Sequence, residues 1–145
     1  MTRSRQPSNP RHVFLDSSGF LSLVNPHDEH HQAAREIWRR LSQDHWRTLT
    51  TNFVVAETHA LFLMRLGHKH ATDFLREIAL SSTVIVRISP RDEEQARGII
   101  FQYEDKDFSL TDATSFAVMQ RLSIPYAFTF DRHFAQYGLN MLTAG

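Results

Sequence analysis

Asp16 and Asp131 lie far apart in the sequence, yet both stand where a carboxylate could take part in chemistry. Asp16 directly follows the apolar run from His12 to Leu15, and Asp131 directly follows the run from Tyr126 to Phe130. Such runs are typical of strands buried in a parallel sheet, so both carboxylates are expected at the same edge of that sheet. Aspartate after a strand also commonly turns the chain or caps a helix.

Glu57 lies in the apolar stripe of a helix predicted from Thr51 to Leu66. The positions i, i+3, i+7 and i+10 of this stripe are occupied by Val54, Glu57, Leu61 and Met64. A carboxylate in such a stripe must be paired, protonated or bound to a metal ion, because desolvating a lone charge is costly. No lysine or arginine stands three or four residues away to form a helical ion pair. A distant salt bridge, or a place at the edge of the stripe, remains the alternative.

Asp112 lies in the first turn of a helix predicted from about Thr111 to Leu122. An aspartate in that turn stabilises the helix dipole, which is a sufficient structural role by itself. Phe116 and Met119 follow at i+4 and i+7, however, so the face that carries Asp112 continues toward the core.

Four converging carboxylates would repel one another unless cations neutralised them. Mg²⁺ and Mn²⁺ prefer oxygen ligands, and one or two such ions can activate water and stabilise the leaving oxygen in phosphodiester hydrolysis. The residues predicted to be catalytic and to hold the metal are Asp16, Glu57, Asp112 and Asp131.

The elements that must position these residues alternate between strands and helices. Strands are predicted at His12–Leu15, Trp46–Thr50, Val84–Val86, Tyr126–Phe130 and Leu139–Leu142. The helices are predicted at Ser18–Val24, from Asn25-Pro26 through the stripe Ala34, Ile37, Trp38 and Leu41, at Thr51–Leu66, along the stripe Ala71, Phe74, Leu75 and Ile78, from Ser89-Pro90, and at Thr111–Leu122. This alternation favours an α/β fold with a mainly parallel sheet, in which ligands bind beyond the carboxyl ends of the strands.

Four segments around the acidic residues resemble, in order, the four acidic motifs of the PIN-domain family. They are Phe14-Leu15-Asp16-Ser17-Ser18, the segment from Thr50 to Thr58, the segment from Ser109 to Ser115, and the segment from Phe128 to Phe134. The resemblance extends over the chain after its first eleven residues and is greatest to the toxin ribonucleases of the VapC kind.

This resemblance implies a Rossmann-like three-layer α/β/α sandwich and an endoribonuclease that depends on Mg²⁺ or Mn²⁺. Asp16 and Asp112 would be the core metal ligands, with Glu57 and Asp131 completing the site. The resemblance also implies a homodimer and an inhibitory antitoxin. Some members carry a further acidic residue in the last motif, where this chain has Arg132 and His133 after Asp131.

Several polar residues beside the acidic motifs could support the site. Hydroxyls that could bond the carboxylates or the scissile phosphate belong to Ser17, Ser18, Thr111 and Thr129, although Thr111 also suits a helix cap and Thr129 an ordinary strand position. Arg132 and His133 could bind phosphate, or could be solvated surface residues. The nine histidines do not match the spacing of a zinc motif.

The composition narrows the function classes. The 145 residues include 16 Lys and Arg against 16 Asp and Glu, a balance that counts against a protein that simply coats DNA. The absence of cysteine excludes disulfides, zinc–thiolate sites and cysteine nucleophiles, and it fits a cytoplasmic protein. No apolar run approaches transmembrane length. We expect a flexible basic tail over residues 1–11, without a signal peptide, and a single domain over residues 12–145.

Two other functions are compatible with parts of this pattern. One is a PIN-fold domain that binds RNA or protein without catalysis, although such a domain has no need to hold four mutually repelling carboxylates. The other is a phosphotransfer domain with an aspartyl nucleophile. Asp16-Ser17-Ser18 lacks the D-x-D pattern of one such family, and no lysine follows a late strand as a receiver domain requires.

Overall fold

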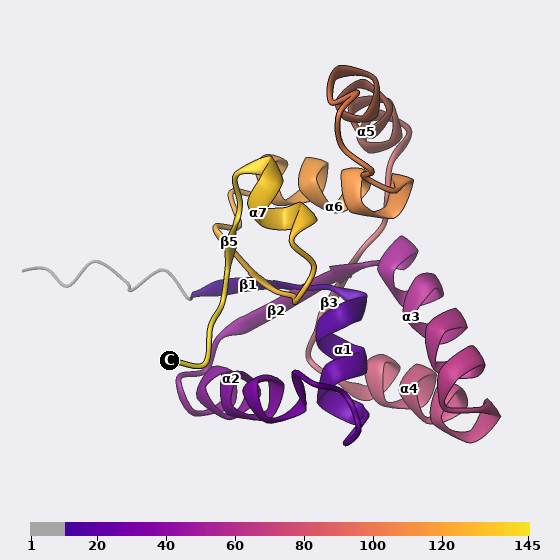
Figure 1. Ribbon diagram of the computed structural model, residues 1–145, viewed down its shortest axis with the longest axis vertical. Coiled ribbons are helices and arrows are strands. Elements are labelled where there is room, and N and C mark those ends of the chain that lie inside the picture. Colours follow the sequence, from indigo (N-terminus) through magenta and orange to yellow (C-terminus); the bar gives the residue numbers. More distant parts are fainter. Residues whose placement is uncertain (1–10) are drawn as a thin grey trace, which may run out of the picture.

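A five-stranded, fully parallel sheet organises the chain in the computed structural model, which describes residues 11–145 (Figure 1). The strands are β1 (His12–Leu15), β2 (Arg47–Thr51), β3 (Val84–Val86), β4 (Tyr126–Phe128) and β5 (Asn140–Met141), in the spatial order β3-β2-β1-β4-β5. All four neighbouring pairs are parallel, which confirms the predicted α/β class. Apart from Arg11, the predicted basic tail lies outside the described residues.

Helices cover both faces of the sheet. They are α1 (Ser17–Val24), α2 (His31–Gln43), α3 (Asn52–Arg65), α4 (His68–Leu80), α5 (Pro90–Gln102), α6 (Leu110–Arg121) and α7 (His133–Tyr137). In Figure 1 the sheet crosses the middle, with α6 and α7 above it and α1, α2 and α4 below, so the predicted three-layer arrangement is present. Among residues 11–145, no helix is long and apolar enough to cross a membrane.

The central strand β1 determines where a ligand can bind. Val13, Phe14 and Leu15 are completely buried, because β2 and β4 flank the strand and helices cover both of its faces. The chain passes from β1 to β2 on one side and later returns to β4 on the other, so β1 lies at a switch point in strand order. Parallel sheets bind ligands at the carboxyl ends of strands at such a point, and Asp16 is the residue that follows β1 there.

The chain between α1 and α2 differs from the prediction. Asn25 does not open a helix but ends α1, where its N–H donates to the Leu21 carbonyl. Asp28 then accepts hydrogen bonds from the Ser22 hydroxyl and the His30 N–H, and α2 begins only at His31. The proline after Asn25 suited a helix start, but these side-chain bonds stabilise a turn instead.

The last predicted strand before Asp131 is also shorter than expected. β4 ends at Phe128 because the next backbone groups bond to side chains rather than to the sheet. The Phe130 N–H donates to Ser18 Oγ, and the Asp131 N–H donates to Thr129 Oγ1. The helix α7 that follows is too short to produce a helical periodicity in the sequence, and it was not predicted.

The predicted stripe of α3 is partly wrong. Val54 is buried as expected, but Met64 is 83% exposed, and Thr58 and Phe62 share the buried face instead. The helix is therefore rotated relative to the prediction, and Glu57 lies half-buried at the edge of the buried face. Glu57 thus faces the end of the sheet rather than the core.

Gly19 allows α1 to pack directly against the end of β4. A Cβ atom at this position would lie 2.5 Å from the Phe128 carbonyl oxygen, which belongs to the backbone and cannot rotate away. We expect Gly19→Ala to lower the free energy of unfolding by roughly 3 kcal/mol, the upper range for overpacking a core. Gly98→Ala is the matched control, because a Cβ atom at Gly98, on the exposed face of α5, would have no neighbouring atom within 4 Å.

Chemical denaturation of the two variants checks this prediction. Alanine at Gly98 should raise the free energy of unfolding by up to about 1 kcal/mol, the usual gain over glycine inside a helix. Equal small changes at both positions would contradict the close approach of α1 to Phe128.

The α5–α6 hairpin positions the start of α6, which carries Asp112. Arg121 donates two hydrogen bonds to the buried Asp92 carboxylate, at 2.9 Å and 3.0 Å. Burial opposes the ionisation of Asp92, but its hydrogen bonds to Arg121 and Ser89 hold its pKa below the ordinary value. This ion pair joins the N-terminal turn of α5 to the C-terminal turn of α6 and fixes the orientation of α6.

Candidate active site

Asp16 occupies the N-cap position of α1, but its side chain does not cap the helix. Its Oδ2 atom accepts hydrogen bonds from Thr129 Oγ1 at 2.8 Å and from Ser18 Oγ at 2.9 Å. The residue is only 3% exposed. The local capping role that the sequence allowed is therefore not used, and the carboxylate is held at the carboxyl end of the sheet.

Ser18 and Thr129 join α1 to the segment that follows β4. Their hydroxyl oxygens lie 3.0 Å apart, and each also accepts a backbone N–H from the residues after Thr129. The two residues whose hydroxyls bond the Asp16 carboxylate thus also fix the backbone that carries Asp131. Both hydroxyls thus form the bonds to a carboxylate that the sequence analysis suggested.

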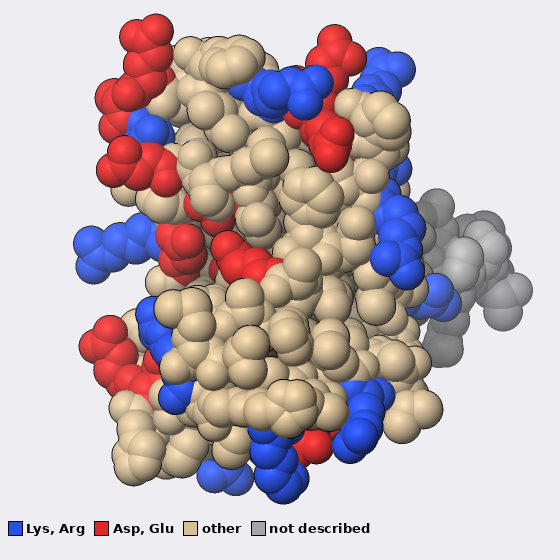
Figure 2. Space-filling view, turned by 90° about the vertical axis from the view of Figure 1, so that its right-hand side faces the viewer, with Lys and Arg blue, Asp and Glu red and all other residues tan. Residues whose placement is uncertain are grey.

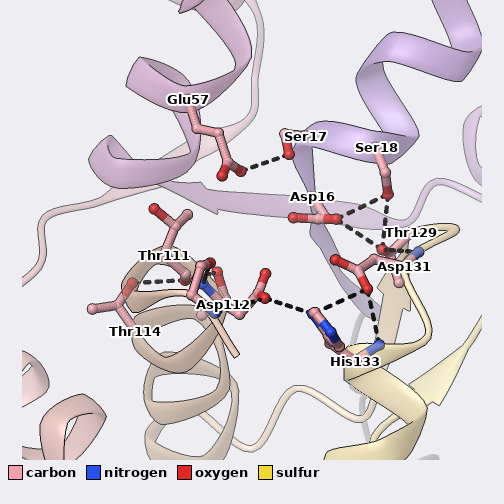
Figure 3. Close-up of polar contacts among 12 residues, drawn as sticks. Asp16, Ser17, Ser18, Glu57, Thr111, Asp112, Thr114, Thr129, Asp131 and His133 are labelled. Carbon is pink, nitrogen blue, oxygen red and sulfur yellow. Dashed lines mark hydrogen bonds and ion pairs between the residues drawn. The ribbon is translucent and has the colours of Figure 1, made fainter. Parts of the chain in front are cut away.

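Glu57 extends from α3 toward Asp16. The Ser17 hydroxyl donates a 2.6 Å hydrogen bond to Glu57 Oε2, so neighbouring residues Ser17 and Ser18 each orient one acidic side chain. Figure 3 shows Asp16, Glu57, Asp112 and Asp131 directed toward a common space between α1, α3, α6 and α7. The four side chains thus come together as the sequence predicted.

Asp112 has both of the roles that the sequence left open. As part of a capping box in α6, its Oδ2 accepts the Ser109 N–H at 3.1 Å, and its own N–H donates to Ser109 Oγ at 3.0 Å. The same Oδ2 atom lies 2.8 Å from His133 Nδ1. The cap therefore fixes a carboxylate that is nearly buried and directed into the cluster.

Asp131 is the most exposed of the aspartates in the cluster, with a side chain 33% exposed. Its Oδ1 accepts the His133 N–H at 2.9 Å and lies 3.3 Å from His133 Nδ1. His133 is the first residue of α7 and links Asp112 to Asp131. The contact between His133 and Asp112 joins residues 21 positions apart, and no local sequence signal could have shown it.

The electrostatics of the cluster favour a cation. Burial raises the pKa of Asp16 to about 6, against its hydrogen bonds to Thr129 and Ser18, and the charges of Glu57 and Asp112 raise it further. Burial also raises the pKa of Glu57 above its ordinary value, with repulsion from Asp112 and Asp131 in the same direction. Within residues 11–145, no lysine or arginine forms a salt bridge with any of these carboxylates.

The donor set suits a hard divalent cation. Carboxylate oxygens predominate, hydroxyl groups orient them, and no lysine or arginine of the described residues forms a salt bridge with them. Mg²⁺ and Mn²⁺ bind such oxygen-rich sites. Together, Asp112, Asp131 and His133 also place one ligand atom each within 4.8 Å of one another.

The remaining predicted residues have different positions. Among the described residues, the Thr111 hydroxyl makes no hydrogen bond to the acidic cluster, and its carbonyl instead accepts the Thr114 and Ser115 hydroxyls. The alternative role of Thr111 as the helix cap is wrong, because Ser109 caps α6, and a bond from Thr111 to the scissile phosphate stays a prediction. Arg132 is exposed next to Asp131, where a side chain could reach a phosphate of a bound substrate.

Removing the Thr129 hydroxyl is expected to weaken metal binding. Thr129→Val takes away the 2.8 Å bond to Asp16 and the acceptor for the Asp131 N–H, while it keeps the side-chain volume. Loss of such a supporting group typically costs about 10- to 100-fold in metal affinity. Titration calorimetry with Mn²⁺ measures this change.

Thr83→Val is the control for this experiment. It removes a hydroxyl that bonds Thr48 at 2.8 Å near the start of β2, at the opposite end of the strand from the cluster. If both variants bind Mn²⁺ as tightly as the wild type, the hydrogen bonds of Thr129 do not organise a metal site.

Comparisons with known proteins match nearly the whole chain. A model of the PIN domain family matches residues 13–139. A 23S rRNA-specific endonuclease, VapC20 of Mycobacterium tuberculosis, is 35% identical over 127 residues, which cover 87% of this chain and 94% of that protein. The crystal structure of M. tuberculosis VapC20, described as a sarcin–ricin loop cleaving toxin, superposes with a TM-score of 0.84 at 29% identity, over 90% of this chain and 98% of that one.

A toxin–antitoxin complex from Klebsiella pneumoniae contains a chain with the same fold. That chain superposes on this one with a TM-score of 0.62 at 18% identity. The match covers 92% of this chain and 98% of that chain. At this level of identity the likeness concerns the fold alone.

Proposed function

The chain belongs to the PIN domain family, and from that premise we propose that it is a metal-dependent endoribonuclease and the toxin of a toxin–antitoxin pair. The observation that carries the proposal is the convergence of Asp16, Glu57, Asp112 and Asp131 at the carboxyl end of the sheet, without a lysine or arginine salt bridge to them among the described residues. A purely structural role would not require a cluster whose charges oppose one another.

The proposed catalytic residues would hold one or two divalent ions. When bound, Mg²⁺ or Mn²⁺ supplies the positive charge that offsets a scissile phosphate and favours ionisation of an attacking water. Ser17 orients Glu57, and Ser18 and Thr129 orient Asp16, so the oxygens are in place before the ion arrives. Hydrolysis adds this water to phosphorus and releases the ribose oxygen with a proton.

The surface around the cluster also suits a polyanionic substrate. Figure 2 shows the face at the end of the sheet, with acidic side chains near its middle and both acidic and basic side chains toward its margins. Basic side chains at the margins would contact phosphates on either side of the scissile bond and position the strand. Arg132, exposed next to Asp131, is one candidate for this contact.

The substrate class is proposed from the activity of a relative. VapC20 is a 23S rRNA-specific endonuclease described as a sarcin–ricin loop cleaving toxin. We propose that a structured ribosomal RNA loop is also the substrate of this chain, that an antitoxin protein inhibits it, and that it acts as a homodimer.

A cleavage assay on purified protein, free of inhibitor, tests the function. The panel contains a hairpin with the 23S sarcin–ricin loop, the same hairpin with a scrambled loop, and a fully paired duplex, each in Mn²⁺, Mg²⁺ or EDTA. We expect a single cut in the intact loop in either metal and none in EDTA. Cleavage of every RNA would retain the nuclease but reject loop specificity, and no cleavage with folded protein would favour a non-catalytic binding domain.

A further inference from the structure

We infer that His133 Nδ1 is a direct metal ligand and that Asp112, Asp131 and His133 form a mixed oxygen–nitrogen site that prefers a transition ion such as Mn²⁺ to Mg²⁺. The inference rests on the proposed metal-dependent function and adds a ligand of a different chemical kind to it. The acidic residues alone would form an oxygen-only site, which either ion can occupy.

The spacing of the three ligand atoms supports this site. His133 Nδ1 lies 2.8 Å from Asp112 Oδ2 and 3.3 Å from Asp131 Oδ1, and one donor atom from each residue falls within 4.8 Å of the others. Neighbouring ligands of an octahedral ion, with bonds of about 2.1 Å at right angles, lie about 3 Å apart. The two nitrogen–oxygen distances are close to this value, so one ion could contact all three atoms with little movement.

The imidazole is held in this position by contacts that do not involve the ion. The backbone N–H of His133 donates to Asp131 Oδ1. The imidazole ring packs edge to face against Phe108, with ring centroids 5.4 Å apart. The next residue, Phe134, is completely buried and anchors α7. The His133 side chain remains 28% exposed, so the space it faces is open to an incoming ion.

A neutral imidazole would add a ligand atom to the site without adding negative charge to the carboxylates already there. The ring must carry its proton on Nε2, which leaves the Nδ1 lone pair directed at the ion in place of the hydrogen bond to Asp112. Imidazole nitrogen binds first-row transition ions better than Mg²⁺, which retains oxygen ligands and water.

A competing role for His133 gives different results. If the ring remains a hydrogen-bond donor to Asp112 and Asp131, it orients the carboxylates and the metal has oxygen ligands only. In that case its removal should affect Mn²⁺ and Mg²⁺ binding equally, and the nitrogen should lie outside the coordination sphere.

Pulsed EPR of the full-length wild-type protein loaded with Mn²⁺ tests the inference directly. We expect the electron-spin-echo envelope to show modulation from one coordinated ¹⁴N nucleus, which changes to the ¹⁵N pattern when histidine is labelled with ¹⁵N. Mn²⁺ bound without this nitrogen coupling, or no bound Mn²⁺, would overturn the inference. This measurement needs no variant and does not depend on activity.

Two glutamine variants extend the test to ion preference. In calorimetric titrations, His133→Gln should lose the nitrogen signal and weaken Mn²⁺ binding by at least about tenfold, while Mg²⁺ binding changes much less. His30→Gln is the control, because His30 is also partly exposed but stacks on Phe130 and contacts Glu29 instead of a carboxylate of the cluster. Equal losses for the two ions would overturn the preference. RNA cleavage in both metals without a nitrogen signal would retain the nuclease and reject the ligand.

Discussion

Replacing Asp112 by asparagine is expected to reduce RNA cleavage by about 10³-fold or more while the protein stays folded. Asparagine can still accept the Ser109 N–H through its amide oxygen, so the capping box of α6 is retained. The charge that would hold the cation is lost, and the electrostatic contribution of a catalytic metal is worth several kcal/mol, where each ~1.4 kcal/mol is tenfold in rate.

Asp107→Asn is the matched control for this substitution. Asp107 precedes α6 by a few residues and is exposed, so its loss removes the same charge from the same segment without reaching the cluster. Single-turnover cleavage of the loop hairpin should be close to wild type for this control and nearly absent for Asp112→Asn. Far-UV circular dichroism should be unchanged for both. Equal activity of the two variants would place the catalytic centre elsewhere.

The approach of Asp16 and Asp112 to one site could be predicted because each depends on a local pattern. Asp16 follows a buried strand in the structure as it does in the sequence, and the parallel pairing of β1 with β2 and β4 brings the carboxyl ends of these strands to one edge. Asp112 lies in the first turn of its helix as predicted, although the residue that caps the helix is Ser109 and not Thr111. Patterns of burial and capping involve residues close together in the chain, so they can be recognised in a single sequence.

The position of Glu57 was predicted for a reason that is partly wrong. The predicted stripe included Met64, which the structure leaves 83% exposed, while Thr58 is buried in its place. Thr58 can be buried because its hydroxyl donates to the Val54 carbonyl within the same helix. Hydrophobicity alone cannot show that the hydroxyl of a buried threonine has a hydrogen-bond partner within its own helix. The predicted buried face was therefore rotated relative to the face that the structure buries.

The contacts of His133 could not be predicted from the sequence. They require the end of β4, the short helix α7 and the start of α6 to meet, and the end of β4 depends on side-chain bonds between distant segments. Ser18 and Thr129, 111 residues apart, fix the backbone that leads to α7. Specific contacts of this kind follow from tertiary packing, which has no periodic signature in the chain.

Replacing Asp16 by asparagine is expected to stabilise the metal-free protein while it abolishes tight metal binding. Burial raises the pKa of Asp16 to about 6 from an ordinary value of 3.8, so the folded state holds a proton that the unfolded chain has released between these values. The unfolding free energy therefore falls as the pH rises through this window, because the folded state binds more protons than the unfolded state. A difference of about two pKa units corresponds to roughly 3 kcal/mol.

Urea unfolding of wild type and Asp16→Asn in EDTA, at pH values from about 4 to 7, isolates this effect. The asparagine does not titrate, so the difference in unfolding free energy between variant and wild type should grow by roughly 3 kcal/mol across the range. Asp44→Asn is the control, because its side chain is 56% exposed. The difference between this control and wild type should stay nearly constant with pH.

Adding Mn²⁺ at pH 7 should then reverse the order of stability. At pH 7, above the pKa of about 6, the ion binds the ionised Asp16 of the folded wild type, so stability rises with metal concentration according to the binding constant. The asparagine variant loses a core ligand and should gain little. The penalty that the buried carboxylate imposes on the metal-free fold is thus the energy that a cation recovers on binding. If Mn²⁺ stabilised both proteins equally, the charge of Asp16 would have no part in holding the ion, and its burial would need a different explanation.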